Sequence, residues 1–182
     1  MRELIVSLVQ SINGSYAQDG WSTGVSTKAD FAYFTSLRRQ AGAIIIDRRT
    51  ALNPNLPVIN GAGKALEHTP VHVLTESDPE VLAAQLAELG LDYRAHHLTP
   101  DTVAEVVESV EATSDTLVCE SGPNLAYRLL DSYPGAQLHL SLSPRYSRNS
   151  GSHFCRLEAD IDLCVIDVRT VDDQVFVRYA KA

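Results

Sequence analysis

The sequence has few of the residues that mark metal, redox or disulfide chemistry. It holds three cysteines in 182 residues and no C-x-x-C spacing, and its six histidines are not accompanied by such a pair. Zinc sites and thioredoxin-like redox sites depend on that spacing, so we expect no metal site. An odd, sparse cysteine set is typical of free thiols in a reducing compartment. Because Cys119 and Cys164 stand in strand-like apolar runs, we expect both to be buried.

Basic residues and long apolar runs are also scarce. There are 15 Lys and Arg against 23 Asp and Glu, a net charge of −8. A general nucleic-acid binder needs a basic face, so that class is excluded, while a local pocket for a small phosphorylated ligand is not. The apolar run at 4–12 is too short and too interrupted to span a membrane, and the basic-then-apolar pattern of a signal peptide is missing. We expect a cytoplasmic protein without nucleic-acid or membrane partners.

Several catalytic motifs are missing as well. The sequence has no G-x-S-x-G nucleophile elbow, no P-loop and no G-x-G-x-x-G fingerprint, and its Gly61-Ala62-Gly63 lies in a loop rather than directly after a strand. A serine hydrolase is therefore not indicated, and neither is phosphate binding through those two glycine-rich motifs.

Short apolar strands alternating with amphipathic helices make up the body of the sequence. With 45% hydrophobic and 21% charged residues, the composition fits one soluble domain over residues 1–182. Strands are predicted at 4–9, 42–46, 71–75, 116–119 and 137–143, with a possible short strand at 91–93. Helices are predicted at 29–40, 79–90, 100–110 and 123–130, and a terminal hairpin pairs 161–168 with 174–179. The fold class is therefore α/β, with a mostly parallel sheet and an antiparallel C-terminal hairpin.

The stretch from Glu120 to Asn124 connects a predicted strand to a predicted helix. The turn at Ser121-Gly122 is made of small residues, and Pro123 suits the first helical position. Such a turn can present backbone N–H groups at a helix N-terminus to an anion, and glycine allows a phosphate to come close. An ordinary strand-to-helix connection explains the same residues equally well.

Polar residues end the other predicted parallel strands too. These ends are Ser11 to Gly14, Asp47 to Thr50 and Thr75 to Ser77. In an open parallel sheet, ligands bind beyond the carboxyl ends of the strands, so the residues could form a crevice for a phosphorylated cofactor. Polar residues also end most ordinary strands. The single tryptophan, Trp21, lies in the loop after the first strand, where it is either a packing anchor or a platform for a ligand.

Taken in order, these segments resemble the reductase domain of the bacterial riboflavin-biosynthesis deaminase-reductase. The matching segments are 7–17, 37–38, 42–46, 50, 117–130, 138–144 and 176–179. They cover nearly the whole chain, and nothing in it corresponds to the deaminase half. The resemblance implies a stand-alone domain with the three-layer fold of dihydrofolate reductase.

That family implies an NADPH-dependent reductase, usually a homodimer, acting on a small heterocycle such as the pyrimidine of riboflavin biosynthesis or a pterin-like ring. Hydride transfer needs no enzyme nucleophile, only positioning and a proton relay. By resemblance, Glu120 and Asn53 are the candidate catalytic residues. The candidate cofactor-binding residues are Asp47, Thr50, Thr75, Ser121, Gly122, Pro123 and Asn124, and the candidate substrate-binding residues are Ser11, Asn13 and Trp21.

The sequence departs from the family pattern at several of these positions. Where the family has aspartate, glycine and a basic residue, this chain has Asn13, Gly14 and Ser15; Asp47 and Ser121 stand where the family has glycine, and Asn53 stands near a family carboxylate. A carboxylate at Asp47 could repel a phosphate. The alternative is therefore a non-catalytic or repurposed small-molecule-binding protein on the same fold, and a purely structural dimer is a third possibility.

Overall fold

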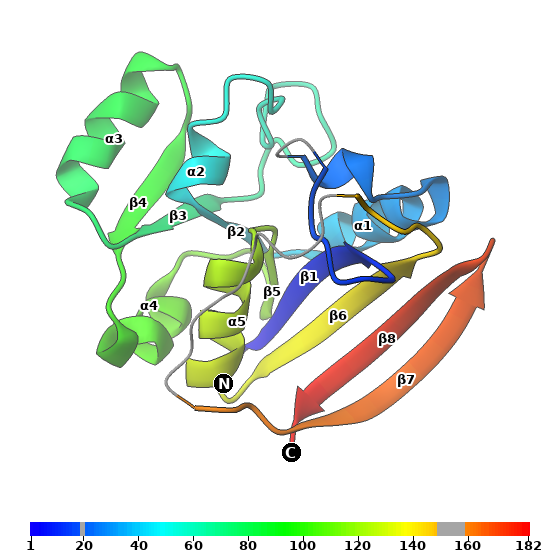
Figure 1. Cartoon of the computed structure of the whole chain (residues 1–182). Helices are drawn as coiled ribbons and strands as arrows, with labels where there is room; N and C mark the ends of the chain where they lie inside the picture. Colours follow the sequence, from blue (N-terminus) through cyan, green and yellow to red (C-terminus); the bar gives the residue numbers. More distant parts are fainter. Residues whose placement is uncertain (19–20, 149–158) are drawn as a thin grey trace.

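The computed structural model describes residues 1–18, 21–148 and 159–182, and its centre is an 8-stranded sheet (Figure 1). The strand order is β4-β3-β2-β5-β1-β6-β8-β7. All pairs from β4 to β6 are parallel, whereas β8 is antiparallel to β6 and to β7. The expected parallel sheet with an antiparallel C-terminal hairpin is therefore confirmed. The strands are β1 (Glu3–Ser11), β2 (Ala43–Asp47), β3 (Val71–Thr75), β4 (Tyr93–His97), β5 (Thr116–Cys119), β6 (Ala136–Ser143), β7 (Leu163–Val171) and β8 (Gln174–Lys181).

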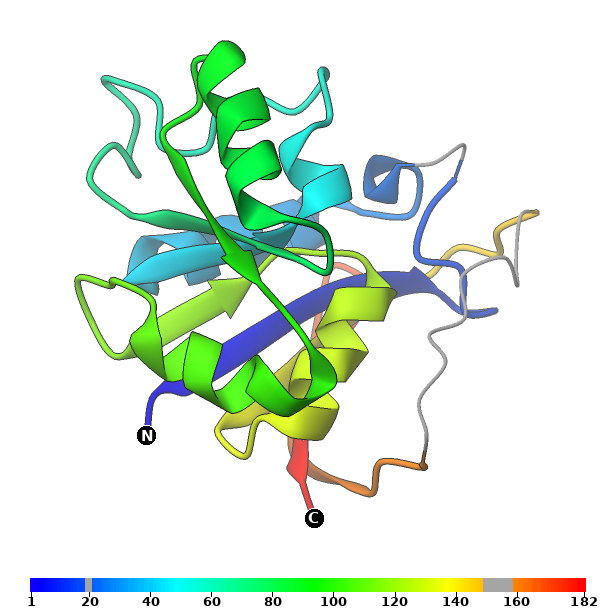
Figure 2. The same ribbon diagram turned by 90° about the vertical axis from the view of Figure 1, so that its left-hand side faces the viewer.

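Helices cover both faces of the sheet and give three layers (Figure 2). One hydrophobic cluster joins α1, α2 and α3 to one face, and a second joins α4 and α5 to the other. The helices are α1 (Lys28–Gln40), α2 (Arg48–Ala51), α3 (Pro79–Glu88), α4 (Val103–Ser109) and α5 (Pro123–Ser132), with short 3-10 turns at Ser22–Gly24 and Pro100–Thr102. The described residues form no helix that is long and apolar enough to cross a membrane.

Side-chain caps explain where most of these helices begin. The side chain of Thr27 accepts a hydrogen bond at the start of α1, Asp47 does so at α2, and Asp78 does so at α3. Each cap satisfies a backbone N–H that has no partner within its helix. The start of α5 differs, because its N-cap is Gly122 and no side chain of the described residues caps it.

The structure corrects several predicted details of the elements. The short helix α2 was not predicted, because its polar sequence carries no apolar stripe. β4 begins at Tyr93, where the predicted strand 91–93 ends. The helical spacing of Phe31, Phe34 and Leu37 predicts one apolar side for the helix at 29–40. Phe31 is nevertheless 67% exposed, since α1 faces the sheet through Tyr33 and Leu37.

One further correction concerns the burial of a cysteine. Cys119 is buried as predicted, but Cys164 is exposed because β7 lies at the end of the sheet. Cys155 lies outside the described residues. On β6, His139 is 5% exposed and Ser141 2% exposed. This more polar face is buried because α1 packs on it: the Tyr33 ring stacks on the His139 ring, and the Tyr33 hydroxyl lies 2.7 Å from His139 Nδ1.

Candidate active site

The polar ends of four parallel strands lie along one edge of the sheet. β5 lies between β1 and β2, and β3 follows β2, so Asp47, Thr75 and Glu120 occupy the carboxyl edge. Ser11 lies farther along, because β1 continues past Val6, the residue opposite Cys119. The chain crosses here from β2 into α2 and from β5 into α5. This is the region where an open parallel sheet accommodates a ligand.

Glu120 is held by an arginine from the neighbouring helix. Arg38 of α1 donates through Nε to Glu120 Oε1 and through Nη2 to Glu120 Oε2, each at 2.7 Å. The glutamate side chain is 4% exposed and the arginine side chain 27% exposed. Burial raises the pKa of the Glu120 carboxyl, and the hydrogen bonds and charge of Arg38 oppose that rise. A two-pronged pair of this kind fixes the plane of the carboxylate as well as its charge.

Asp47 and Ser121 join the two strand-to-helix crossings. The Asp47 carboxylate accepts a hydrogen bond from the N–H of Thr50 at 2.6 Å, and the Asp47 N–H donates to Ser121 Oγ at 2.7 Å. The carboxylate therefore caps the N-terminus of α2. Ser121 is 8% exposed, and its hydroxyl oxygen accepts this bond between strands. That contact gives a structural reason for serine where the family has glycine.

The N-terminus of α5 is not filled by any side chain of the described residues. Gly122 has a φ of −64°, and a Cβ placed on it would meet no atom of these residues within 4 Å, its chain neighbours apart. Glycine is therefore not required here by backbone strain or by a protein neighbour. The carboxylates of Asp47 and Glu120, which could repel an anion, both have hydrogen-bond partners. These residues fit a phosphate group at the start of the helix. Pro123 takes the first turn of α5, and Asn124 follows it on the surface.

The side chains of Thr75 and Asn53 make local turns. Thr75 Oγ1 accepts the N–H of Ser77 at 3.1 Å directly after β3. Asn53 Oδ1 accepts the N–H of Asn55 at 3.1 Å after α2. Such bonds are typical of threonine and asparagine at chain reversals. The predicted roles of these residues toward a cofactor or substrate stay predictions.

The candidate substrate-binding residues hold two loops together. Ser11 Oγ donates to Asn13 Oδ1 at 2.7 Å, and the amide of Asn13 donates to the carbonyl of Ser147 at 2.8 Å. The N–H of Ser147 returns a bond to Asn13 Oδ1 at 2.9 Å. Asn13 thus fastens the loop after β1 to the loop after β6. Trp21 is 37% exposed and forms an isolated bridge with Gln18.

Sequence reasoning missed two ion pairs near this edge. Arg38 lies in one of the short segments that carry the resemblance, and nothing in its spacing points to Glu120, 82 positions away. Arg128 of α5 pairs with Glu76, the residue after β3. On the α5 side, the hydroxyl groups of Tyr16 and Tyr127 lie 2.7 Å apart. Such pairs join segments that are far apart in the sequence, so the patterns within one segment do not predict them.

Comparison with known proteins shows the fold. No protein-family model and no curated protein matches the sequence. Among solved structures, a pyrimidine reductase-like protein from Corynebacterium diphtheriae matches with a TM-score of 0.69 at 18% identity, over 100% of this chain and 92% of that one. RibD from Acinetobacter baumannii matches with a TM-score of 0.62 at 16% identity, over 100% of this chain and 58% of that one.

A bifunctional protein from Thermotoga maritima gives a third match. It is a diaminohydroxyphosphoribosylaminopyrimidine deaminase/5-amino-6-(5-phosphoribosylamino)uracil reductase, with a TM-score of 0.66 at 13% identity. All of this chain aligns, and it spans 57% of that protein. The chain therefore has the dihydrofolate reductase-like fold of these reductases. At such low identity the likeness concerns the fold and not the reaction.

Proposed function

We propose that the protein is an NADPH-dependent reductase of a small heterocycle, either the pyrimidine of riboflavin biosynthesis or a pterin-like ring. The observation that supports the proposal is the N-terminus of α5 at Gly122, which no side chain in the described part of the chain caps, beside a buried and oriented carboxylate at Glu120. In this fold the two features lie at the edge of the sheet where ligands bind. Both the N-terminus of α5 and the Glu120 carboxylate are retained at the positions where the family has them, although the sequence departs from the family pattern elsewhere.

The start of α5 is the proposed site for the cofactor phosphates. NADPH would supply the hydride. The chain's part is to bind the phosphates through the N-terminal N–H groups and dipole of α5, close to Gly122. The Asp47 carboxylate accepts a hydrogen bond from the N–H of Thr50, so its negative charge is partly compensated by the N-terminus of α2. The hydrogen bond from the Asp47 N–H to Ser121 Oγ joins the β2–α2 connection to the β5–α5 connection.

Glu120 is the proposed contact for the substrate ring. Each oxygen of an ionised carboxylate can accept more than one hydrogen bond, so pairing with Arg38 leaves it able to accept from a ring N–H. Burial raises the pKa of the Glu120 carboxyl, the Arg38 guanidinium opposes that rise, and its two hydrogen bonds fix the orientation of the carboxylate. A heterocycle oriented in this way can be held in a reactive position against the cofactor, which is the main demand of hydride transfer.

Titration with NADPH, followed by nicotinamide fluorescence, tests the proposal. We expect saturable binding, and NADPH oxidation on adding a pyrimidine or pterin substrate. The proposal fails if there is no binding at about 1 mM cofactor, the upper end of the usual range of KM values. A parallel titration with NADH measures the preference for the 2′-phosphate.

A second candidate is a small-molecule-binding protein that has lost the reaction. The observation in its favour is that polar side chains at the site already hydrogen-bond to other groups of the protein. Glu120 accepts from Arg38, and Asn13 donates to the carbonyl oxygen of Ser147. This candidate expects tight binding of a heterocycle without NADPH oxidation. Steady oxidation with any pyrimidine or pterin would exclude it.

A further inference from the structure

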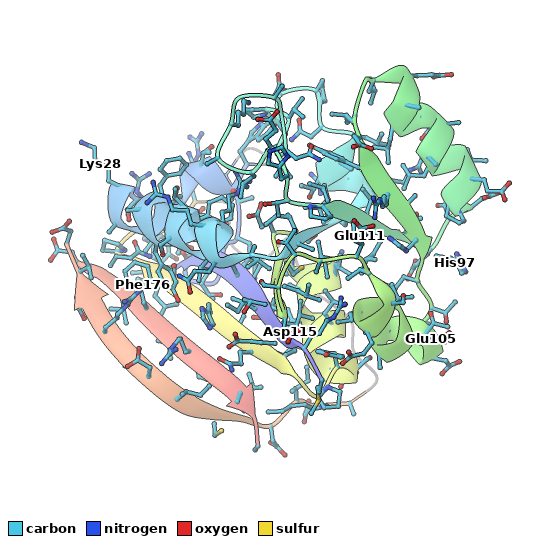
Figure 3. All side chains as sticks on the ribbon, turned by 180° about the vertical axis from the view of Figure 1, so that it is seen from behind. Lys28, His97, Glu105, Glu111, Asp115 and Phe176 are labelled. Atoms are coloured by element: carbon cyan, nitrogen blue, oxygen red, sulfur yellow. The ribbon has the colours of Figure 1, made fainter. Side chains whose placement is uncertain are left out.

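Two arginines of the C-terminal hairpin point to the face of the sheet on which α1 packs. On β7, Asp167 lies opposite Arg178 of β8, and Arg169 lies opposite Phe176. Alternate residues of a strand share a face, and so do residues that lie opposite each other, so all of these side chains are on one face. Figure 3 shows Phe176 on this hairpin beside α1. The side chains of Arg169 and Arg178 are therefore diagonal neighbours, close enough for one small ligand to meet both.

Aromatic rings restrict the side chain of Arg169. Its Cζ lies 4.6 Å from the centre of the Tyr33 ring of α1 and 5.4 Å from the centre of the Phe176 ring. Those two rings also contact each other, with centroids 4.8 Å apart. Cation–π contacts of this kind hold the guanidinium in place and leave most of its N–H donors unused. Arg169 is exposed and forms no ion pair with the described residues, so a ligand from solvent can reach its charge.

These side chains carry one more positive charge than negative charge. Arg178 Nε lies 3.4 Å from Asp167 Oδ2, and the two side chains are 40% and 42% exposed. His139 of β6 lies opposite Arg178 and adds no charge at neutral pH. Burial lowers the pKa of His139 to about 4 together with the charges of Arg178 and Arg169, while Asp167 opposes them. The Asp167 carboxylate offsets one guanidinium, and the charge of the other has no counter-charge among these residues.

Two buried nitrogen atoms at the same place also lack a hydrogen-bond partner. Among the described residues, His139 Nε2 and Arg178 Nε are unpaired, since the contact of Arg178 with Asp167 does not have hydrogen-bond geometry. The Tyr33 hydroxyl lies 2.7 Å from His139 Nδ1, and burial raises the pKa of Tyr33, so the phenol keeps its proton and can donate it to Nδ1. Nε2 then carries the imidazole proton. A buried donor without a partner is unfavourable, and a bound group with acceptor atoms can explain it. Rotation of the partly exposed Arg178 side chain would let such a group reach both nitrogens.

We propose that Arg169 and Arg178 bind the carboxylate of a small organic acid on this face of the hairpin. A carboxylate accepts two N–H groups of a guanidinium in one plane, and its single negative charge matches the uncompensated positive charge. A phosphate ester carries about −1.5 to −2 at neutral pH, which exceeds that charge, and Asp167 would repel it more strongly. None of the candidate cofactor or substrate residues lies on β7 or β8, so this site does not depend on the proposed reaction.

Titration of the full chain with acetate, followed by NMR, tests the site. The Nε–H signals of Arg169 and Arg178 report on their own guanidinium groups, and sodium chloride keeps the ionic strength constant. We expect both signals to shift saturably with one common Kd of about 10 mM or less, which so small a ligand can reach. Shifts that do not saturate, and that are alike for acetate and chloride, would be ionic screening and overturn the proposal. Tighter binding of inorganic phosphate than of acetate overturns the assignment to a carboxylate.

Two substitutions should change the affinity for acetate in opposite directions. Arg169→Met keeps apolar bulk over the two rings but removes the charge, so the affinity, followed at the Arg178 signal, should fall at least about tenfold. Asp167→Asn removes the competing carboxylate and should raise the affinity at least about threefold. Arg39→Met is the matched control, because Arg39 is an exposed arginine in the last turn of α1, and its Kd should equal that of the wild type. Urea denaturation checks that each variant is folded. An unchanged affinity in Arg169→Met, or an unchanged or lower affinity in Asp167→Asn, overturns the proposal.

Discussion

Arg38 holds both carboxylate oxygens of Glu120, with two hydrogen bonds of 2.7 Å that join α1 to the end of β5. The guanidinium also lies 4.5 Å from the centre of the Phe34 ring, which adds a cation–π contact. The candidate catalytic carboxylate is therefore part of the packing between a helix and the sheet. Substitutions here affect stability and function together, and the two effects must be separated.

Replacing Arg38 with methionine should destabilise the protein by about 3 kcal/mol, because it leaves a buried carboxylate without its partner. Adding Glu120→Gln to that variant should recover at least half of the loss, since the neutral amide needs no counter-charge. Urea denaturation of the wild type, the two single variants and the double variant measures this coupling. If the two substitutions are additive, the pair makes no net contribution.

Glu120→Gln alone tests the proposed role toward the substrate. If the carboxylate orients the heterocycle, the variant should lower kcat at least tenfold while the Kd for NADPH changes less than about twofold. Glu76→Gln is the control, because it removes an exposed carboxylate from the end of β3, which β2 separates from β5. Equal losses of turnover and of cofactor affinity in Glu120→Gln would indicate a structural role only.

The sequence predicted the fold well because local patterns determine most of it. The strand at Thr116–Cys119 and the helix after Pro123 follow from an apolar run, a small-residue turn and helical spacing. What the sequence could not reveal depends on contacts between distant segments. The Arg38–Glu120 pair is one case, and the commitment of Asp47 to the α2 N-terminus is another, because α2 carries no apolar stripe. The exposure of Cys164 depends on which strand ends the sheet.

Buried histidines should make the protein less stable in mild acid. His72 is fully buried, with Nδ1 2.8 Å from His96 Nε2 and Nε2 2.7 Å from the carbonyl oxygen of Glu111. The pKa of His72 is lowered from 6.5 to about 4, chiefly by burial and also by the charges of His96 and Arg94, while the carbonyl and the carboxylate of Glu111 oppose the fall. Between these values the unfolded chain binds a proton that the folded chain does not, so the free energy of unfolding falls as the pH falls.

We expect His72 to contribute a loss of about 2 kcal/mol between pH 7.5 and pH 5. Urea denaturation at the two pH values should show this loss in the wild type and a smaller one in His72→Gln. His68→Gln is the control, because that side chain is exposed and should not change the difference between the two pH values. An unchanged pH dependence in His72→Gln would assign the effect to another group, such as buried His139, whose pKa is also lowered to about 4.

Gly122 offers the most direct test of the phosphate site, because stability and binding should change in opposite directions. Aspartate at this position has room for its side chain and can cap α5, which has no side-chain cap among the described residues. Gly122→Asp should therefore leave the protein as stable as the wild type or stabilise it by up to about 1 kcal/mol. Its charge would stand where the cofactor phosphates are proposed, so the affinity for NADPH should fall more than tenfold.

Gly122→Asn separates charge from bulk in that experiment. Asparagine caps a helix about as well as aspartate and has nearly the same shape, but it carries no charge. Thermal unfolding with and without NADPH, together with fluorescence titration, compares the two variants. Strong loss of affinity in Gly122→Asp with little loss in Gly122→Asn supports an anion at this helix. Equal losses would mean that the space in front of Gly122 is needed whatever the charge of the ligand, and two unaffected variants would move the cofactor away from α5 altogether.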